Sequence, residues 1–253
     1  MITVVVKCKN EEYNIPKMLD SVKSFADSII VVDDFSTDRT VEIASKHGAL
    51  VIPALVHKGH IDLMDKQGFQ SVRQGWILRM DADERLTSEL AVELKRVHDL
   101  NIHDGVLFAR SNIIFGKALR HGGWFQSNRL GFFKASSWDR NWDCKMHSQV
   151  PVLGAILEIP KTKAHMLHDD YKSVSQFIER TLLRYSATES MERVYNVKIY
   201  HLFTLPLRKF LGKYFIRKGF KDGSHGLVLA ILLATYELLI LIQIWDMNRS
   251  KKQ

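Results

Sequence analysis

Six carboxylates follow short apolar runs in the first third of the chain. They are Glu11, Glu12, Asp33, Asp34, Asp81 and Asp83. In an open parallel sheet, ligands bind beyond the carboxyl ends of the strands, so we expect these side chains at one sheet edge. Carboxylates gathered there repel one another unless a cation lies among them. Mg²⁺ or Mn²⁺ needs only one or two protein carboxylates when phosphate oxygens and water complete its shell. The pattern predicts a divalent metal beside a phosphate-bearing ligand.

The elements that position these acids alternate between strand and helix. Apolar, β-branched runs predict strands at 2–6, 28–32, 49–52, 75–80 and 105–110. Apolar periodicity and capping residues predict helices at 14–25, from Thr37 or Asp38 to about 46, at 62–73 and at 87–97. This order implies an α/β fold, with a mostly parallel sheet, right-handed crossovers and flanking helices.

The pattern becomes irregular from about residue 112. This stretch is rich in glycine and tryptophan, with Gly116, Gly122, Gly123, Trp124, Trp138 and Trp142. It predicts loops and short strands around a binding cleft. A helical pattern returns at 173–193.

Composition excludes several classes of protein. Apolar residues make up 46% of the 253 residues and charged residues 25%, which is typical of a globular protein and not of a disordered one. Two cysteines, Cys8 and Cys144, are too few for a disulfide framework and suit a reducing compartment. No basic region precedes the first apolar run, so we expect no secretory signal and a cytosolic N-terminus.

The C-terminal third carries the whole net charge of +8, because residues 1–160 contain 20 residues of each sign. Six cations at 208–221 alternate with aromatic and aliphatic residues, and the apolar run 227–245 follows. A helix of that length spans about 28 Å, close to a bilayer core of about 30 Å. The run could be a buried helix, a membrane span or a monotopic anchor.

Glu237, near the centre of the apolar run, argues against a span because a charge inside a membrane is costly. Basic residues flank the run on both sides, so they give no orientation. We favour a monotopic arrangement, with the basic aromatic stretch in the membrane interface and the apolar helix partly immersed or packed on another copy of the chain.

Three motifs, taken in order, resemble glycosyltransferase family 2. They are Val-Lys-Cys-Lys-Asn-Glu-Glu at 6–12, Val-Val-Asp-Asp-Phe-Ser-Thr-Asp at 31–38 and Trp-Ile-Leu-Arg-Met-Asp-Ala-Asp-Glu at 76–84. Their order and spacing are those of the family's GT-A nucleotide-sugar domain. Arg-His-Gly-Gly-Trp at 120–124, His-Asp-Asp-Tyr at 168–171 and the basic apolar tail resemble the branch with lipopolysaccharide-core and capsule glucosyltransferases. The resemblance covers most of the chain.

The resemblance implies a metal-dependent site for a UDP-sugar. Asp83 matches the metal-binding second Asp of the DxD motif, Asp81 the one nearer the ribose, and His168 could complete the metal or diphosphate site. Asp34, or else Asp33, matches the Asp that recognises uracil. Further donor-site positions implied in this way are Glu11 or Glu12 beside the base and ribose, and Lys66 near the uracil or diphosphate.

The resemblance also implies an acceptor half. Arg120, His121, Gly122, Gly123 and Trp124 would shape the sugar and acceptor pocket. Residues 1–195 would form the catalytic domain, with the nucleotide-sugar half at about 1–110 and the acceptor half at about 111–195. Residues 196–253 would associate with the membrane.

The general base departs from the family pattern. Related sequences have an acid directly after the position that matches His147, but Ser148 stands here. An inverting transfer needs a base to take the proton of the acceptor hydroxyl. His147 and Asp143 are the candidates; alternatively, the chain has lost or altered its activity.

The resulting hypothesis is an inverting hexosyltransferase with Mn²⁺ or Mg²⁺ as cofactor. Its donor would be a UDP-sugar, and its acceptor a lipid-linked or cell-envelope glycan such as lipopolysaccharide core or capsule. We expect it at the cytoplasmic face of the inner membrane, peripheral or monotopic, with a possible homo-oligomer and no nucleic acid partner.

Two alternatives remain. A sugar-phosphate nucleotidyltransferase would carry a basic Gly-rich loop after the first strand, and Lys-Asn-Glu-Glu at 9–12 opposes triphosphate binding there. A non-catalytic basic membrane-binding protein on a GT-A scaffold would suit the tail. RNA binding is disfavoured because 227–245 is too apolar for an RNA-binding face.

Overall fold

The computed structural model describes residues 1–55, 62–143, 149–193 and 195–250. Contacts divide the chain into two units. The sheet unit comprises Met1–Arg110 and Ser127–His168, and the helical unit comprises Ser111–Gln126 and Asp169–Gln253. The predicted boundary at residue 195 therefore falls inside the helical unit. The physical reason is that residues before 195 bond to the C-terminal helix: the Gln243 side chain donates to Ser186 Oγ at 3.2 Å.

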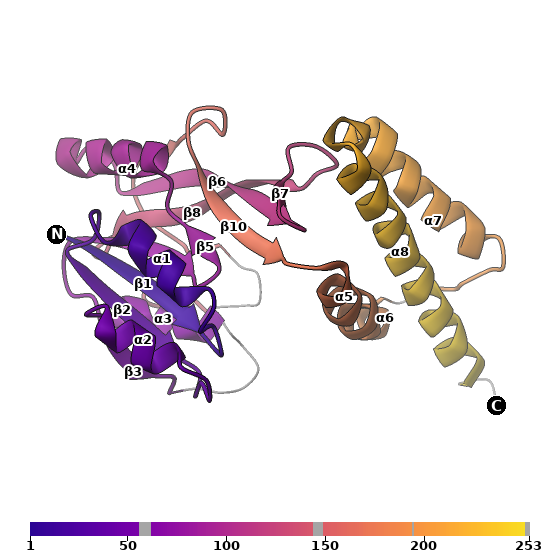
Figure 1. Ribbon diagram of the computed structural model, residues 1–253, viewed down its shortest axis with the longest axis horizontal. Helices are drawn as coiled ribbons and strands as arrows, with labels where there is room; N and C mark the ends of the chain where they lie inside the picture. The colour runs from indigo at the N-terminus through magenta and orange to yellow at the C-terminus, as the bar shows by residue number, and fades with distance from the viewer. Residues whose placement is uncertain (56–61, 144–148, 194, 251–253) are drawn as a thin grey trace. The chain divides into compact units, whose positions relative to one another are not determined.

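Parallel strands form the N-terminal part of the sheet unit, as the alternating pattern predicted. They are β1 (Ile2–Cys8), β2 (Ser28–Asp33), β3 (Leu50–Pro53) and β4 (Trp76–Asp81). Their order across the sheet is β3-β2-β1-β4, and every pair in it is parallel. The connecting helices are α1 (Ile15–Val22), α2 (Thr40–Lys46) and α3 (Asp62–Gln70), seen around these strands in Figure 1. The predicted α/β fold is confirmed.

Beyond β4 the sheet becomes mixed, which the prediction of a mostly parallel sheet missed. The order continues β8-β6-β10-β5, and β8 pairs antiparallel with β4. These strands are β5 (Glu84–Arg85), β6 (Gly105–Ile114), β8 (Phe125–Lys134) and β10 (His165–Tyr171). The short strands β7 (Lys117–Ala118) and β9 (Ile156–Glu158) pair with β6. β6 extends the predicted strand at 105–110 to Ile114, and β8 is a long strand in a stretch expected to hold only loops and short strands.

Alternating side chains of β1 fill two hydrophobic cores. Val4 and Val6 lie in a cluster with Met18 of α1 and Leu90 of α4 (Ser88–Leu100). Val5, on the opposite face, lies in a cluster with residues of α3 and β8. A Cβ on Gly68 of α3 would overlap the Val5 side chain, so glycine allows α3 to approach the sheet closely. This packing holds β1 in a fixed position, and with it the acidic edge at its carboxyl end.

Local side-chain hydrogen bonds support the starts of two helices. Thr87 Oγ1 accepts the Leu90 amide at 3.2 Å and begins α4, as its sequence predicted. Asp38 Oδ1 accepts the Thr40 amide at 2.9 Å and supports the start of α2. The N-cap of α2 is Arg39, which makes no side-chain cap hydrogen bond, so the prediction that Thr37 and Asp38 cap this helix is wrong; Asp38 bonds to the first helical residue from outside the helix.

The helical unit is built mainly from α5 (Val174–Phe177), a π-helical segment η1 (Ile178–Tyr185), α6 (Ser186–Glu192), α7 (His201–Leu211) and α8 (Ser224–Ser250). A second π-helical segment η2 (Gly212–Ile216) and a 3₁₀ turn η3 (Gly219–Asp222) join α7 to α8. Figure 1 shows α7 and α8 side by side. Phe177, Leu182 and Leu229 belong to the core of this unit.

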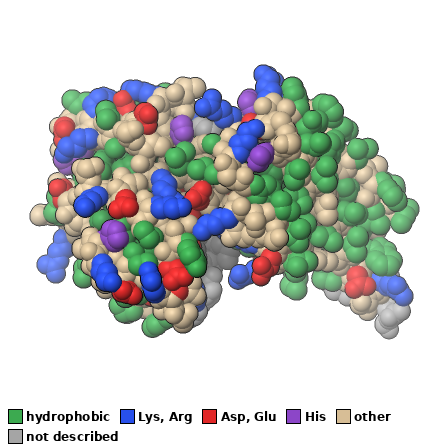
Figure 2. All heavy atoms as spheres, in the orientation of Figure 1, with side chains coloured by type: hydrophobic (Ala, Val, Ile, Leu, Met, Phe, Trp, Pro, Cys, Tyr) green, Lys and Arg blue, Asp and Glu red, His purple; other side chains and the backbone are tan. Residues whose placement is uncertain are grey.

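α8 is long and apolar enough to cross a membrane, by length and composition. Large apolar side chains of α7 and α8 are exposed, and Figure 2 shows hydrophobic atoms gathered over these helices. Glu237 of α8 is 9% exposed and pairs with Arg193 at 2.9 Å and Lys209 at 3.4 Å. The sequence argument against a membrane span treated Glu237 as an isolated charge. Because its charge is neutralised within the unit, that argument no longer applies.

Candidate active site

Parallel pairing brings the acidic strand ends to one edge of the sheet unit. Cys8 of β1 is in register with Asp33 of β2, and Lys7 of β1 with Asp81 of β4. Asp34 directly follows β2, and Asp83 lies in the turn between β4 and β5. The structure thus brings together the carboxylates of two of the three predicted motifs.

Asp81 is surrounded by cations of the protein itself. Its carboxylate lies 3.5 Å from Lys7 Nζ, 3.2 Å from Arg129 Nη1 and 3.5 Å from Arg110 Nη1. Burial opposes ionisation of Asp81, but Lys7 and the three arginines Arg129, Arg79 and Arg110 outweigh it and hold its pKa well below the usual range. Asp81 is therefore a compensated anion.

Glu84 and Asp65, which the sequence analysis did not assign, complete this network. Glu84 is fully buried, and its oxygens meet Arg129 at 2.8 Å, Arg110 at 3.2 Å and the Asp81 amide at 2.8 Å. The buried Asp65 pairs with Lys7 at 2.8 Å and Arg79 at 2.6 Å. Carboxylates at this edge thus have protein cations among them. The premise that an added metal is needed to relieve their repulsion is wrong for Asp81.

Asp83 has a different environment. Among the residues that the structure describes, it forms one ion pair, with His168 Nε2 at 3.4 Å. β10 places His168 there by pairing antiparallel with β5, opposite Glu84. Burial disfavours the imidazolium, but the hydrogen bond and charge of Asp83 and the charge of Glu84 outweigh it and raise the pKa of His168. Within the described part of the chain, Asp83 therefore has no lysine or arginine partner of the kind that compensates Asp81.

The Asp83–His168 pair fits a divalent metal as a partial ligand set. Two adjacent ligands of an octahedral Mg²⁺, each at roughly 2.1 Å from it, lie about 3 Å apart, close to the observed separation. No group of three His, Cys, Asp or Glu side chains suited to a metal occurs in the described part of the chain. Donor oxygens from a bound phosphate would have to complete such a site.

The loops after β1 and β2 are tied together beside this pair. Asn10 Oδ1 accepts the Thr37 amide at 2.8 Å, and Glu12 Oε2 accepts the Arg39 amide at 3.2 Å. Asp33 accepts both the amide and the hydroxyl of Ser36, at 2.9 and 2.5 Å. Asp33 and Glu12 therefore hold the loop in shape.

The other two predicted donor-site acids in these loops also have protein partners. Asp34 is buried and pairs with Lys9 at 2.9 Å. Glu11 Oε2 accepts the Asn14 side-chain amide at 2.6 Å. Both predicted donor-site carboxylates are therefore engaged by protein groups in this structure.

The remaining predicted residues of the sheet unit lie on the segment around residue 142. Lys66 of α3 donates to the Trp142 carbonyl at 2.6 Å and so anchors that segment. Asp143 is exposed and follows it directly. His147 lies outside the described residues. Of the two candidate bases, Asp143 is therefore the one that the structure describes.

The predicted acceptor residues Arg120–Trp124 belong to the helical unit, where a residue missed by the sequence analysis holds them. Asp222 is 5% exposed and accepts the Arg120 amide at 3.4 Å, the His121 amide at 2.9 Å and the His121 Nδ1–H at 3.1 Å. In the sequence, Asp222 stands out only as an acid directly after a run of cations. That position does not indicate a partner about 100 residues away.

We expect Asp222→Ala to destabilise the protein by about 1–3 kcal/mol, because it removes three hydrogen bonds from the buried side of this loop. Urea unfolding measures the change, with exposed Asp246→Ala in α8 as the matched control. Amide hydrogen exchange should quicken at Arg120 and His121. Unchanged exchange at those two amides would contradict a role for Asp222 in holding the loop.

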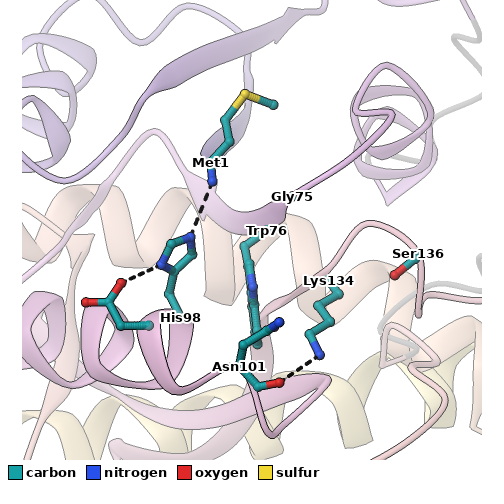
Figure 3. Close-up of a pocket in the computed structure, with 8 residues that line it drawn as sticks. Met1, Gly75, Trp76, His98, Asn101, Lys134 and Ser136 are labelled. Atoms are coloured by element: carbon teal, nitrogen blue, oxygen red, sulfur yellow. Dashed lines mark hydrogen bonds and ion pairs between the residues drawn. The ribbon is translucent and has the colours of Figure 1, made fainter.

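A shallow pocket of the sheet unit lies at the opposite ends of the strands. It is lined by Met1, Trp76 at the start of β4, His98, Asn101 and Lys134, among others (Figure 3). Met1 and Trp76 mark the amino ends of β1 and β4, whereas the acidic cluster lies at their carboxyl ends. This pocket is therefore separate from the candidate site.

Comparisons with known proteins concern the sequence and the fold of the chain. The sequence model described as glycosyl transferase family 2 matches residues 3–152. An uncharacterized glycosyltransferase of Rickettsia typhi is 27% identical over 98% of this chain and 87% of its own.

Among solved structures, Staphylococcus aureus TarS 1–349 has a TM-score of 0.51 at 14% identity, covering 100% of this chain and 92% of that one. The same protein in complex with UDP has a TM-score of 0.50 at the same identity and coverage. Against a longer TarS structure, the chain spans 45% of the length. At this identity the likeness concerns the fold.

Proposed function

Because the chain belongs to glycosyltransferase family 2, we propose that it transfers a hexose from a UDP-sugar to a lipid-linked or cell-envelope glycan acceptor. The observation that carries this proposal is the Asp83–His168 pair at the carboxyl edge of the sheet. It supplies an oxygen and a nitrogen ligand next to loops fixed by Asp33 and Glu12. The similar TarS fold was solved with UDP, which supports a uridine nucleotide as the ligand.

In the proposed donor site, Asp34 binds the uracil and Asp81 lies near the ribose. Glu11 or Glu12 lies beside the base, and Lys66 near the uracil or diphosphate. The cations around Asp81 keep it ionised, so it accepts hydrogen bonds and does not donate them. This electrostatic setting favours a ligand with hydroxyl donors, such as a ribose.

Asp83 and His168 would hold Mn²⁺ or Mg²⁺. When bound, such an ion neutralises charge that develops on the leaving diphosphate. The protein's own contribution is to keep both side chains at a rigid sheet edge, with His168 fixed by the pairing of β10 with β5. His168 would hold the ion through its neutral imidazole, so the ring would have to give up the proton that Asp83 favours on it.

Asp143 or His147 would act as general base. In a single inverting displacement, this group takes the proton of the acceptor hydroxyl while the oxygen attacks the anomeric carbon. Asp143, exposed beside the segment that Lys66 anchors, is accessible to a substrate hydroxyl. Arg120–Trp124 would contact the sugar or acceptor.

The exposed apolar surface of α7 and α8 suits an acceptor held at a membrane. We place the enzyme at the cytoplasmic face of the inner membrane, peripheral or monotopic, acting on a lipopolysaccharide-core or capsule-like glycan. The cations at 208–221 would lie toward anionic headgroups, because each cation near such a surface contributes about 1 kcal/mol of attraction.

Calorimetric titration of UDP into the detergent-purified chain tests the donor assignment. We expect binding with Mn²⁺ that weakens at least tenfold in EDTA, since Asp83 and His168 would hold an ion whose positive charge would attract the diphosphate. ADP and GDP, which differ from UDP in the base, are the controls, and they should bind more weakly than UDP. Equal binding of all three would overturn the uridine assignment, and no nucleotide binding would favour a non-catalytic membrane protein.

A further inference from the structure

Three cations of the helical unit repeat every four residues on one helical face. They are Lys209 at the end of α7, Lys213 in η2 and Arg217 directly after it. Residues four apart are neighbours on a helix surface, so the charges lie close together. Like charges held together raise the free energy of the folded state unless anions compensate them.

Protein carboxylates compensate only the first of these cations. Lys209 pairs with Glu237 at 3.4 Å. Within the described residues, neither Lys213 nor Arg217 forms an ion pair. Burial, then the charges of Arg217 and Lys209, lower the pKa of Lys213 to about 8. The adjacent acid Asp222 is engaged with His121 and the loop amides.

Lys213 and Arg217 both lie against the loop at 122–124. The Lys213 Nζ lies 5.7 Å from the centroid of the Trp124 ring, and the Gly122 amide donates to the Arg217 carbonyl at 2.8 Å. A Cβ on Gly123 would lie 2.5 Å from Arg217 Nη1 and 3.3 Å from Lys213 Nζ. Glycine at this position, with a φ of +82°, therefore lets the two cations converge on the loop.

Exposed apolar side chains border the converging cations. Phe215 and Ile216, between Lys213 and Arg217, are 53% and 79% exposed, and Leu211 just before them is 41% exposed. A cationic pair within an apolar surface suits an anion attached to a hydrocarbon chain, because both parts of such a ligand are satisfied at once.

We propose that Lys213 and Arg217, held by the loop at 122–124, bind the phosphate group of a lipid. The phosphate belongs to a phospholipid headgroup or to the lipid carrier of the acceptor. Arg217 supplies a planar pair of N–H donors and Lys213 a point charge, the two usual protein partners of phosphate. The inference deepens the proposed function, on which it rests, by locating the acceptor's membrane contact.

Vesicle sedimentation of the full chain tests this site. The vesicles are phosphatidylcholine alone, or with phosphatidylglycerol, phosphatidic acid or polyprenyl phosphate at matched charge. Lys213→Gln/Arg217→Gln is compared with Arg208→Gln/Lys221→Gln, which removes the same charge from exposed positions of the same segment. We expect the first variant to lose at least about tenfold more affinity than the second on the phosphate-bearing vesicles.

The pattern across vesicles identifies the source of the phosphate. An excess loss on both phospholipids indicates a headgroup site, whereas an excess loss on polyprenyl phosphate alone indicates the acceptor's carrier. Equal losses by the two double variants on every vesicle would overturn the proposal, because general surface attraction would then explain the binding. Lys213→Met keeps the apolar stem on Trp124 and repeats the test if the double variant folds poorly.

UDP titration of the same samples keeps the two proposals separate. Asp83→Ala should bind the vesicles like the wild type even though its UDP binding is impaired. If the wild-type protein does not bind UDP, the donor site is contradicted. The vesicle result would still test the lipid site, because it does not depend on UDP binding.

Discussion

Replacing Asp83 by alanine is expected to lower the rate constant of sugar transfer about a hundred- to a thousandfold, equivalent to about 3–4 kcal/mol of transition-state stabilisation. The physical reason is that Asp83 is the edge carboxylate that no lysine or arginine among the described residues compensates. Its removal would leave His168 as the single proposed protein ligand of the metal. Transfer assays with UDP-sugars, and UDP titration with Mn²⁺ and with EDTA, measure the effect.

The control for this prediction is Asp20→Ala, which removes an exposed carboxylate from α1. It should leave both transfer and Mn²⁺-dependent UDP binding unchanged. His168→Ala should weaken UDP binding in Mn²⁺ and have little effect in EDTA. Full activity of Asp83→Ala would contradict the metal site. The turn that contains Asp83 would then serve only to connect β4 with β5.

Glu84→Ala is expected to lower the free energy of unfolding by about 3–5 kcal/mol. The mutation leaves Arg110 and Arg129, whose side chains are 18% and 14% exposed, without the carboxylate between them. It also frees the Asp81 amide at the end of β4. Urea unfolding of the wild type and the variant gives the difference.

Glu42→Gln is the matched control for the Glu84 experiment. It breaks the exposed pair of Glu42 with Lys46 within α2 and should leave the free energy of unfolding nearly unchanged, because exposed ion pairs contribute little to stability. A small effect of Glu84→Ala would mean that Asp81 alone can neutralise both arginines. In that case Asp81 would be unavailable for a ligand.

The sequence predicted the parts of the fold that depend on local patterns. Strands β1 to β4 and their helices follow from apolar runs and capping residues such as Thr87. Because parallel strands share an edge, the position of Asp83 followed directly. The family assignment followed from the same segments, since their motifs lie at strand ends.

The rest depended on pairings between distant segments. Arg110 and Arg129 lie on β6 and β8, and nothing local indicates that these strands bring guanidinium groups to Asp81. The sequence shows how many acids lie at the sheet edge, but it does not show which basic side chains from other strands pair with them. The inference of a metal from acid repulsion was therefore incomplete, and the metal site proposed above depends instead on the contrast between Asp81 and Asp83.

The helical core has a practical consequence for preparing a water-soluble form of this enzyme. Leu229 of α8 is buried with Phe177 and Leu182, and Glu237 of the same helix neutralises Arg193. Ending the chain before α8 would uncover that core and remove the carboxylate that pairs with Arg193 and Lys209. Solubility is better sought by exchanging outward apolar residues of α8, such as Ile231 and Ile242, for polar ones while the helix stays in place.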